Sequence, residues 1–96
     1  MGRVIVRYQG IIASIVEASR EYYDLSDLTL RSLLNSMSTR HGYDFRKLIK
    51  ENPTYFVLVD ERLIDLDRDA DMKLSDESRV DLMMAVAGGE PQPRTL

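Results

Sequence analysis

The side chains that most often carry catalysis or bind metals are scarce in this sequence. It contains no cysteine and one histidine, His41, which lies three residues before Asp44. The lack of cysteine excludes disulfides, thiolate nucleophiles and thiolate zinc sites, and a lone histidine argues against any zinc site. A His41–Asp44 dyad can be imagined, but a histidine at the end of a helix more often complements the helix dipole. No Ser/His/Asp set is evident, so we expect a protein that is not an enzyme and needs neither metal nor cofactor.

A dense acidic run lies in the second half of the chain. Its carboxylates, with Arg62 and Arg68 between them, are Asp60, Glu61, Asp65, Asp67, Asp69 and Asp71. A calcium-binding loop would need a glycine inside the run, which is absent, so we interpret the run as solvated surface. The net charge of −3 gives no reason to expect a nucleic-acid partner. No apolar run approaches the roughly 18 residues of a membrane span, and the start lacks a signal peptide's apolar segment. We therefore expect a cytoplasmic protein with no membrane partner.

Two consecutive glycines near the C-terminus are the most informative feature. Gly88 and Gly89 follow Ala87 and precede a tail, Glu90–Leu96, that contains two prolines. Glycine lacks a Cβ, so such a pair can pass through a channel too narrow for side chains. Taken alone, the dipeptide more often marks the end of a strand and the start of a loop. Its meaning therefore depends on the elements that precede it.

The first part of the chain predicts two strands. Arg3–Tyr8 alternates apolar and mostly polar residues, as a half-buried strand does. Ile11–Ala18 fits either a strand or a short helical turn. We interpret Gly10–Tyr23 as a loosely ordered return that ends in a second, antiparallel strand within Arg20–Leu25.

A helix follows, because apolar residues recur at i, i+3, i+4 and i+7. This stripe is formed by Leu30, Leu33, Leu34 and Met37. Ser26, Asp27 and Thr29 are candidate N-caps, and Gly42 suits the left-handed position after the helix. Phe45–Lys50 is expected to add a helical turn.

Three further strands are expected. Tyr55–Val59 is apolar on both faces and should lie inside the sheet, Leu63–Ile64 is short, and Arg79–Val86 is the last strand. The first and last strands both alternate, and both could pair with Tyr55–Val59. One helix with one apolar stripe covers one face of a sheet, which predicts a two-layer α+β domain.

This order, with a diglycine directly after the last strand, resembles the ubiquitin-like β-grasp superfamily. Within it the chain is similar to the small sulfur carriers of molybdopterin and thiamine synthesis and to archaeal ubiquitin-like modifiers. The resemblance is carried by Val4–Tyr8, Thr29–Leu34, Phe56–Val59, Leu74–Val80 and Val86–Gly89. It implies a mixed sheet of 4–5 strands packed on one main helix. Residues 1–87 would form the domain, 88–89 the diglycine and 90–96 a flexible tail.

The resemblance also implies a chemistry for the diglycine. Proteins of this superfamily are activated at a C-terminal carboxylate by an adenylating enzyme of the ubiquitin-activating type, which uses ATP. Val86–Gly89, if extended, would project roughly 13 Å beyond the sheet. Sulfur carriers end at the second glycine, whereas here Glu90 is joined to Gly89. We therefore expect a precursor that is cut after Gly89 by a cysteine protease or a JAMM-type metalloprotease.

Three functions remain open after that step. As a modifier, the protein would be conjugated through Gly89 to target lysines, with the help of a conjugating enzyme. As a sulfur carrier, it would form a thiocarboxylate for molybdopterin, thiamine or tRNA thiolation. It could also only dock to partners. The tail favours the modifier, on which only Lys47, Lys50 and Lys73 could carry chains.

A partner-binding surface is expected on one face of the sheet. By analogy with the apolar patch of ubiquitin, Ile5, Leu58 and Met83 would form it, ringed by arginines. Leu58 is equally compatible with packing against the chain's own loops.

Overall fold

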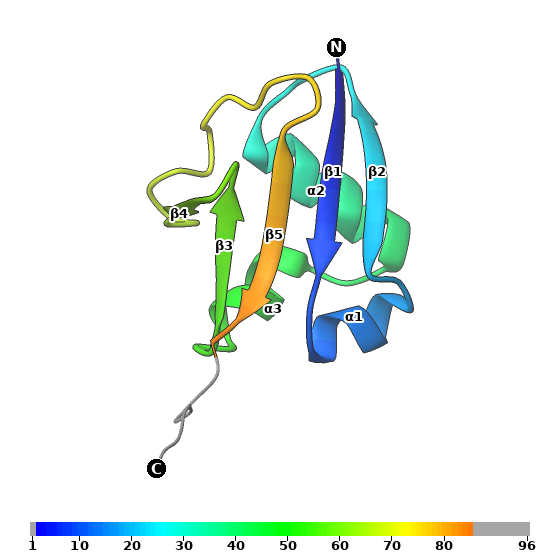
Figure 1. Ribbon diagram of the computed structural model, residues 1–96, viewed down its shortest axis with the longest axis vertical. Helices are drawn as coiled ribbons and strands as arrows, with labels where there is room; N and C mark the ends of the chain where they lie inside the picture. Colours follow the sequence, from blue (N-terminus) through cyan, green and yellow to red (C-terminus); the bar gives the residue numbers. More distant parts are fainter. Residues whose placement is uncertain (1, 86–96) are drawn as a thin grey trace.

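The computed structural model describes residues 2–85, which form one five-stranded sheet with helices on one side. Along the sheet the strands run β2-β1-β5-β3-β4 (Figure 1). The strands are β1 Gly2–Tyr8, β2 Arg20–Leu25, β3 Tyr55–Val59, β4 Arg62–Ile64 and β5 Arg79–Met84. β1 is antiparallel to β2 and parallel to β5, whereas β3 is antiparallel to both β5 and β4. The sheet is therefore mixed, as predicted.

Three helices accompany the sheet. α1 spans Ile11–Val16, α2 spans Leu30–His41 and α3 spans Phe45–Lys50. α2 lies across one face, and α1 lies beyond the end of the β1–β2 hairpin (Figure 1). The two-layer α+β domain predicted from the sequence, a ubiquitin-like β-grasp, is confirmed. No described helix, within residues 2–85, is both long and apolar enough to span a bilayer.

The main helix begins and ends where the sequence indicates. The Thr29 side chain accepts a hydrogen bond from the Ser32 amide at 3.1 Å, which satisfies one of the free donors of the first turn. Gly42 takes the left-handed conformation at φ 74°, and its amide donates to the Ser38 carbonyl. The apolar stripe of α2 is fully inside the molecule.

The core lies between α2 and the inner face of the sheet. Its most deeply buried members are Val4, Val6, Ile12, Leu30, Leu33, Met37, Phe45, Val57, Val80 and Leu82. In β1, Val4, Val6 and Tyr8 are buried and alternate with more exposed residues, which confirms the predicted half-buried strand.

Two expectations were wrong. Gly10–Tyr23 is not a loose return, because Ile12 and Val16, four residues apart, bury the same face of a helical segment, α1. β1 does not pair with β3, because β5 lies between them with Val80 and Leu82 fully buried. The prediction that Tyr55–Val59 lies inside the sheet is confirmed, because β3 pairs with β4 on one side and with β5 on the other.

Candidate functional site

The sequence places the chemistry at Gly88 and Gly89 and the processing site between Gly89 and Glu90. All three residues lie outside the part of the chain that the structure describes. What the structure does show is the end of β5, from which residue 86 and its successors continue. The geometry of that end determines where the diglycine segment begins.

The end of β5 is held from both sides. The Met84 amide donates to Gln9 Oε1 at 3.1 Å, and the Ala85 amide donates to the Thr54 carbonyl at 2.6 Å. Gln9 follows β1 and Thr54 precedes β3, so the two neighbouring strands both anchor the chain at this point. The starting direction of the C-terminal segment is therefore fixed up to Ala85.

Tyr55 stabilises this end of the molecule through two hydrogen bonds of its hydroxyl group. Its hydroxyl donates to the Gln9 carbonyl at 3.0 Å and accepts from the Ile12 amide at 2.9 Å. The side chain is 7% exposed, and its hydrogen bond with Ile12 is shielded from water. One tyrosine thus connects the start of β3, the end of β1 and the start of α1.

Gly10 is required where these elements meet. Its φ of 68° and ψ of −139° belong to a region that only glycine adopts readily. A Cβ at this position would lie 3.0 Å from Met84 Sδ and 3.0 Å from the Tyr55 hydroxyl. The lack of a side chain therefore lets β5 pass close to the start of α1.

Ile5, Leu58 and Met83 all lie on the face of the sheet opposite the helices. Each is partly exposed and none belongs to the core. This placement is compatible with a docking role, which stays a prediction. Asp81 interrupts the three residues, because the register places it opposite Leu58 and two positions before Met83 along β5.

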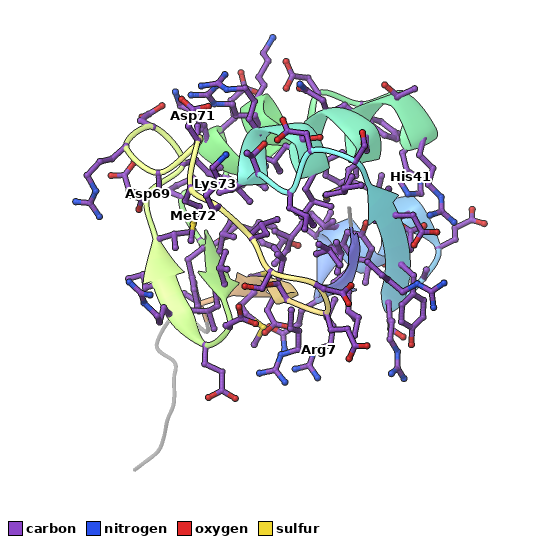
Figure 2. All side chains as sticks on the ribbon, turned by 90° about the horizontal axis from the view of Figure 1, so that it is seen from above. Arg7, His41, Asp69, Asp71, Met72 and Lys73 are labelled. Carbon is purple, nitrogen blue, oxygen red and sulfur yellow. The ribbon has the colours of Figure 1, made fainter. Side chains whose placement is uncertain are left out.

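Asp81 is a buried carboxylate on this otherwise open face. Its side chain is 4% exposed, and its two oxygens accept from Arg7 Nε at 2.7 Å and Arg79 Nε at 3.2 Å. Arg7 extends from the sheet on the side away from the helices (Figure 2). Arg7 and Arg79, two arginines on this face, therefore form an ion cluster with Asp81, which lies opposite Leu58. The alternation of apolar and polar residues did not predict this ion cluster, because it assigns Asp81 to the outer face of β5, where a charged side chain is expected to be exposed.

His41 contacts a different acidic residue from the one considered in the sequence. Its Nε2 lies 2.8 and 3.0 Å from the two oxygens of Glu21, whereas Asp44 caps α3 by accepting from the Lys47 amide. Glu21 is 8% exposed and also accepts from the hydroxyls of Tyr8, at 2.6 Å, and Tyr23, at 2.9 Å. This arrangement joins β1, β2 and the end of α2, with His41 between helix and sheet (Figure 2).

The electrostatics of the Glu21 cluster follow from burial and hydrogen bonding. Burial alone would raise the pKa of Glu21, but the donors Tyr8, His41 and Tyr23 outweigh it and lower that pKa. Burial, together with the hydrogen bond to Glu21, raises the pKa of Tyr8. The cluster is therefore an ionised glutamate surrounded by donors. Its polar groups bond to one another across β1, β2 and α2, and we assign it a structural role.

The acidic run forms surface structure. Asp69 and Asp71 lie in the loop after β4, near Lys73 (Figure 2). Asp71 pairs with Arg31 at 2.7 Å, and Asp67 pairs with Lys50 at 2.7 Å, an interaction that lowers the pKa of Asp67. Across residues 2–85, no three carboxylate, histidine or cysteine groups are grouped as metal ligands would be.

Comparisons with known proteins point to one group of small proteins. The sequence matches the model of the ThiS family over residues 6–89. A search of curated proteins gave no match.

Solved structures with the same fold include three from different organisms. The small archaeal modifier protein 1 of Methanosarcina acetivorans is 15% identical, with a TM-score of 0.68 and coverage of 93% of this chain and 98% of that one. Urm1 of Trypanosoma brucei is 18% identical, with a TM-score of 0.65 and coverage of 92% and 96%. A third match is the complex of subunits 1 and 2 of the molybdopterin-converting factor of Helicobacter pylori. It is 21% identical, with a TM-score of 0.61 and coverage of 91% and 99%.

Proposed function

Because the chain belongs to the ThiS family, a group of ubiquitin-like carrier and modifier proteins, we propose that it is the precursor of a protein modifier that acts through Gly89. One observation carries the proposal: the family match ends at residue 89, the second glycine, while the sequence continues to residue 96. As long as Glu90 is joined to Gly89, the glycine has no free carboxylate. Cleavage of that bond is then the step that makes the protein reactive.

The chemistry after cleavage takes place on partner enzymes. A carboxylate oxygen of Gly89 attacks the α-phosphorus of ATP on an adenylating enzyme, which forms the acyl-adenylate and releases pyrophosphate. A lysine amine of the target then displaces AMP, directly or through a conjugating enzyme, and leaves an isopeptide bond. In this scheme the chain supplies an end that fits a narrow active site and a surface by which partners hold it.

The described residues support this division of labour. Gln9 and Thr54 hold the end of β5, so the reactive segment starts from a fixed point. Ile5, Leu58 and Met83 lie on the open face of the sheet and are our proposed docking surface, in which Met83 is next to that point and Ile5 lies opposite the start of β5. The Helicobacter pylori relative was solved as a protein–protein complex, which is the kind of assembly that we propose for this chain.

The docking surface has a direct test. Ile5→Ser and Met83→Ser should each weaken binding to the adenylating enzyme about tenfold, because each removes partly exposed apolar contact area. Their Tm should change little. Val80→Ser is the matched control, since Val80 lies on the other face of β5 with no exposed surface and its loss should damage the fold. Unfolding of the two surface variants would place these residues in the core and contradict the proposal.

A second function has an observation of its own in favour. The matching family model is that of ThiS, and resemblance to such carriers implies a thiocarboxylate at the terminal glycine. In that case a sulfide-donating partner displaces AMP from the same acyl-adenylate. Both functions share every step up to adenylation, so the acceptor distinguishes them.

One experiment separates the two functions. Protein truncated after Gly89 is incubated with ATP and host lysate and then analysed by intact mass and blotting. A ladder of larger conjugates supports the modifier, and the mass gain of one sulfur-for-oxygen exchange supports the carrier. The full-length chain, whose Gly89 is blocked, is the control and should give neither product until it is cleaved. If the truncated chain also gives neither, both proposals are wrong and docking alone is left.

Maturation is tested separately by mass spectrometry of the protein from its native host. We expect chains that end at Gly89. If only chains that end at Leu96 are recovered, processing after Gly89 does not occur. In that case the protein also has no JAMM-type or cysteine protease as a processing partner.

A further inference from the structure

Two arginines face each other across the β1–β2 hairpin, close to the end of β5. The register pairs Arg7 directly with Arg20. The neighbouring pair is hydrogen-bonded, because the Tyr8 amide donates to the Ser19 carbonyl at 2.9 Å. Arg7 and Arg20 therefore form the non-hydrogen-bonded kind of pair, in which opposite side chains approach most closely. Like charges directly opposite each other destabilise a sheet, so the pairing needs an explanation.

At the other end of the same hairpin the paired residues have opposite charges. There the register pairs Arg3 with Asp24, and Arg3 Nε lies 3.3 Å from the Asp24 carboxylate. Arg7 uses its Nε for Asp81 but keeps a half-exposed side chain, whose terminal amino groups have no hydrogen-bond partner within residues 2–85. Arg20 is exposed and has no carboxylate within 4.0 Å among the described residues. The end of the hairpin nearest the C-terminal segment thus carries unneutralised positive charge.

These arginines border a groove. Its volume is about 320 Å³, and it is lined by Arg7, Tyr8, Gln9, Ser19, Arg20 and Met83. Gln9 is the residue that holds the Met84 amide, so the groove adjoins the point where the C-terminal segment begins. Met83 adds an apolar wall, and the arginines add charge on the other side. A ligand that suits both is short, negatively charged at its tip and aliphatic along its stem.

We propose that this groove receives a glutamate or aspartate side chain of the partner protein that takes up the C-terminal segment. The carboxylate would bind between the guanidinium groups of Arg7 and Arg20, whose planar donors match it in pairs, while its methylene stem contacts Met83. The inference rests on the proposed function, since that function requires such a partner. It adds the chemistry of the contact and places that contact near the end of β5, from which the segment to be delivered continues.

Charge favours a protein carboxylate over a nucleic acid. The chain as a whole carries −3, and the loop after β4 is acidic, so a polyanion would be repelled by most of the surface. A single carboxylate on a partner needs only the local positive charge. Filling the groove would also relieve the repulsion between the two arginines.

The first test uses the chain truncated after Gly89 with the host's adenylating enzyme, followed by ATP–pyrophosphate exchange. Arg20→Glu should raise the KM for the chain about tenfold or more, because it places a negative charge against the partner's carboxylate, and kcat should stay unchanged. Arg20→Ala should have a smaller effect in the same direction. Arg3→Glu is the control on the same face and should change KM less than about threefold, because the Arg3 end of the hairpin is already neutralised.

Folding cannot explain the expected loss. Arg20→Glu replaces a like-charged pair by an attractive one, so its Tm should equal or exceed that of the parent chain. If Arg20→Glu leaves KM unchanged, or if Arg3→Glu raises it equally, the inference is wrong.

A second test needs no enzyme and uses the full-length chain. The isotope-labelled protein is titrated with a short peptide that contains a single glutamate while the arginine Nε–H signals are followed by NMR. Shifts at Arg7 and Arg20 without shifts at Arg3, lost in Arg20→Ala, support the groove. Equal shifts at every surface arginine, or tighter binding of a single-stranded oligonucleotide at the same place, overturn it. If the peptide binds as expected but the chain truncated after Gly89 is not adenylated, the groove stands and the proposed function fails.

Discussion

Replacement of Gly10 by alanine should be the most damaging single-methyl change at the end of β5. The backbone strain of a side chain at φ 68° and ψ −139° costs about 1–3 kcal/mol. The new Cβ would also lie 3.0 Å from Met84 Sδ and from the Tyr55 hydroxyl, so Met84 must leave its preferred rotamer at about 0.5–1.5 kcal/mol. We therefore expect a loss of about 2–4 kcal/mol in the free energy of unfolding.

Gly42 provides the matched control. It also has a positive φ, 74°, but a Cβ there would meet nothing within 4 Å. Gly42→Ala should therefore cost only the left-handed backbone strain, about 1–2 kcal/mol. Urea unfolding of both variants gives the two free energies, and amide exchange at Met84 reports whether its hydrogen bond to Gln9 has weakened. If Gly10→Ala costs no more than Gly42→Ala, and Met84 exchange is unchanged, the close approach of β5 to Gly10 does not constrain this end of the molecule.

Three further predictions concern the core and the buried charges. Leu33→Ala, at a position with no exposed surface, should lower the free energy of unfolding by about 2–5 kcal/mol, and a smaller loss in urea unfolding would contradict its place in the core. Glu21→Gln should destabilise the protein at pH 7, and the difference should shrink as the pH falls below about 4.3. The folded state lowers the pKa of Glu21, so its stabilisation is present above the unfolded value and is lost on acidification. A pH-independent difference in Tm would refute this. Asp81→Asn should cost about 1–3 kcal/mol in thermal unfolding, because it leaves Arg7 and Arg79 without their shared carboxylate, and an unchanged Tm would show that solvent replaces it without loss.

The sequence was most informative where local rules and burial agree. α2 has a 3.6-residue apolar stripe, an N-cap at Thr29 and a left-handed glycine at Gly42, and the structure contains all three. β3 is apolar on both faces and has a strand on each side. Such elements are determined by nearby residues, which is why a single sequence suffices for them.

Long-range pairing was harder to predict. Whether β1 pairs with β3 or with β5 depends on contacts between residues more than seventy positions apart, and alternation is the same in either case. The environment of Asp81 depends on that register, since Arg7 faces it only when β5 is parallel to β1. Glu21 likewise finds Tyr8 and His41 through the tertiary fold. These two buried carboxylates had no local signal that distinguished them from exposed ones.

For the diglycine segment, the sequence was more informative than the structure. Gly88 and Gly89 were found from the sequence and from resemblance, and they lie beyond the described residues. The structure contributes what precedes them, which the sequence did not reveal: the role of Gln9, the need for Gly10 and the charged groove near the end of β5.

The position of β5 has a consequence for folding during synthesis on the ribosome. Among the strands of residues 2–85, β5 is the last to be synthesised, yet it lies in the middle of the sheet, between β1 and β3. The β1–β2 and β3–β4 hairpins emerge earlier and cannot be joined into one sheet until β5 arrives, and such long-range pairing is slow compared with local folding. The diglycine is translated directly after that strand. A nascent chain therefore has no C-terminal segment to offer an enzyme before it also has the strand that completes its sheet.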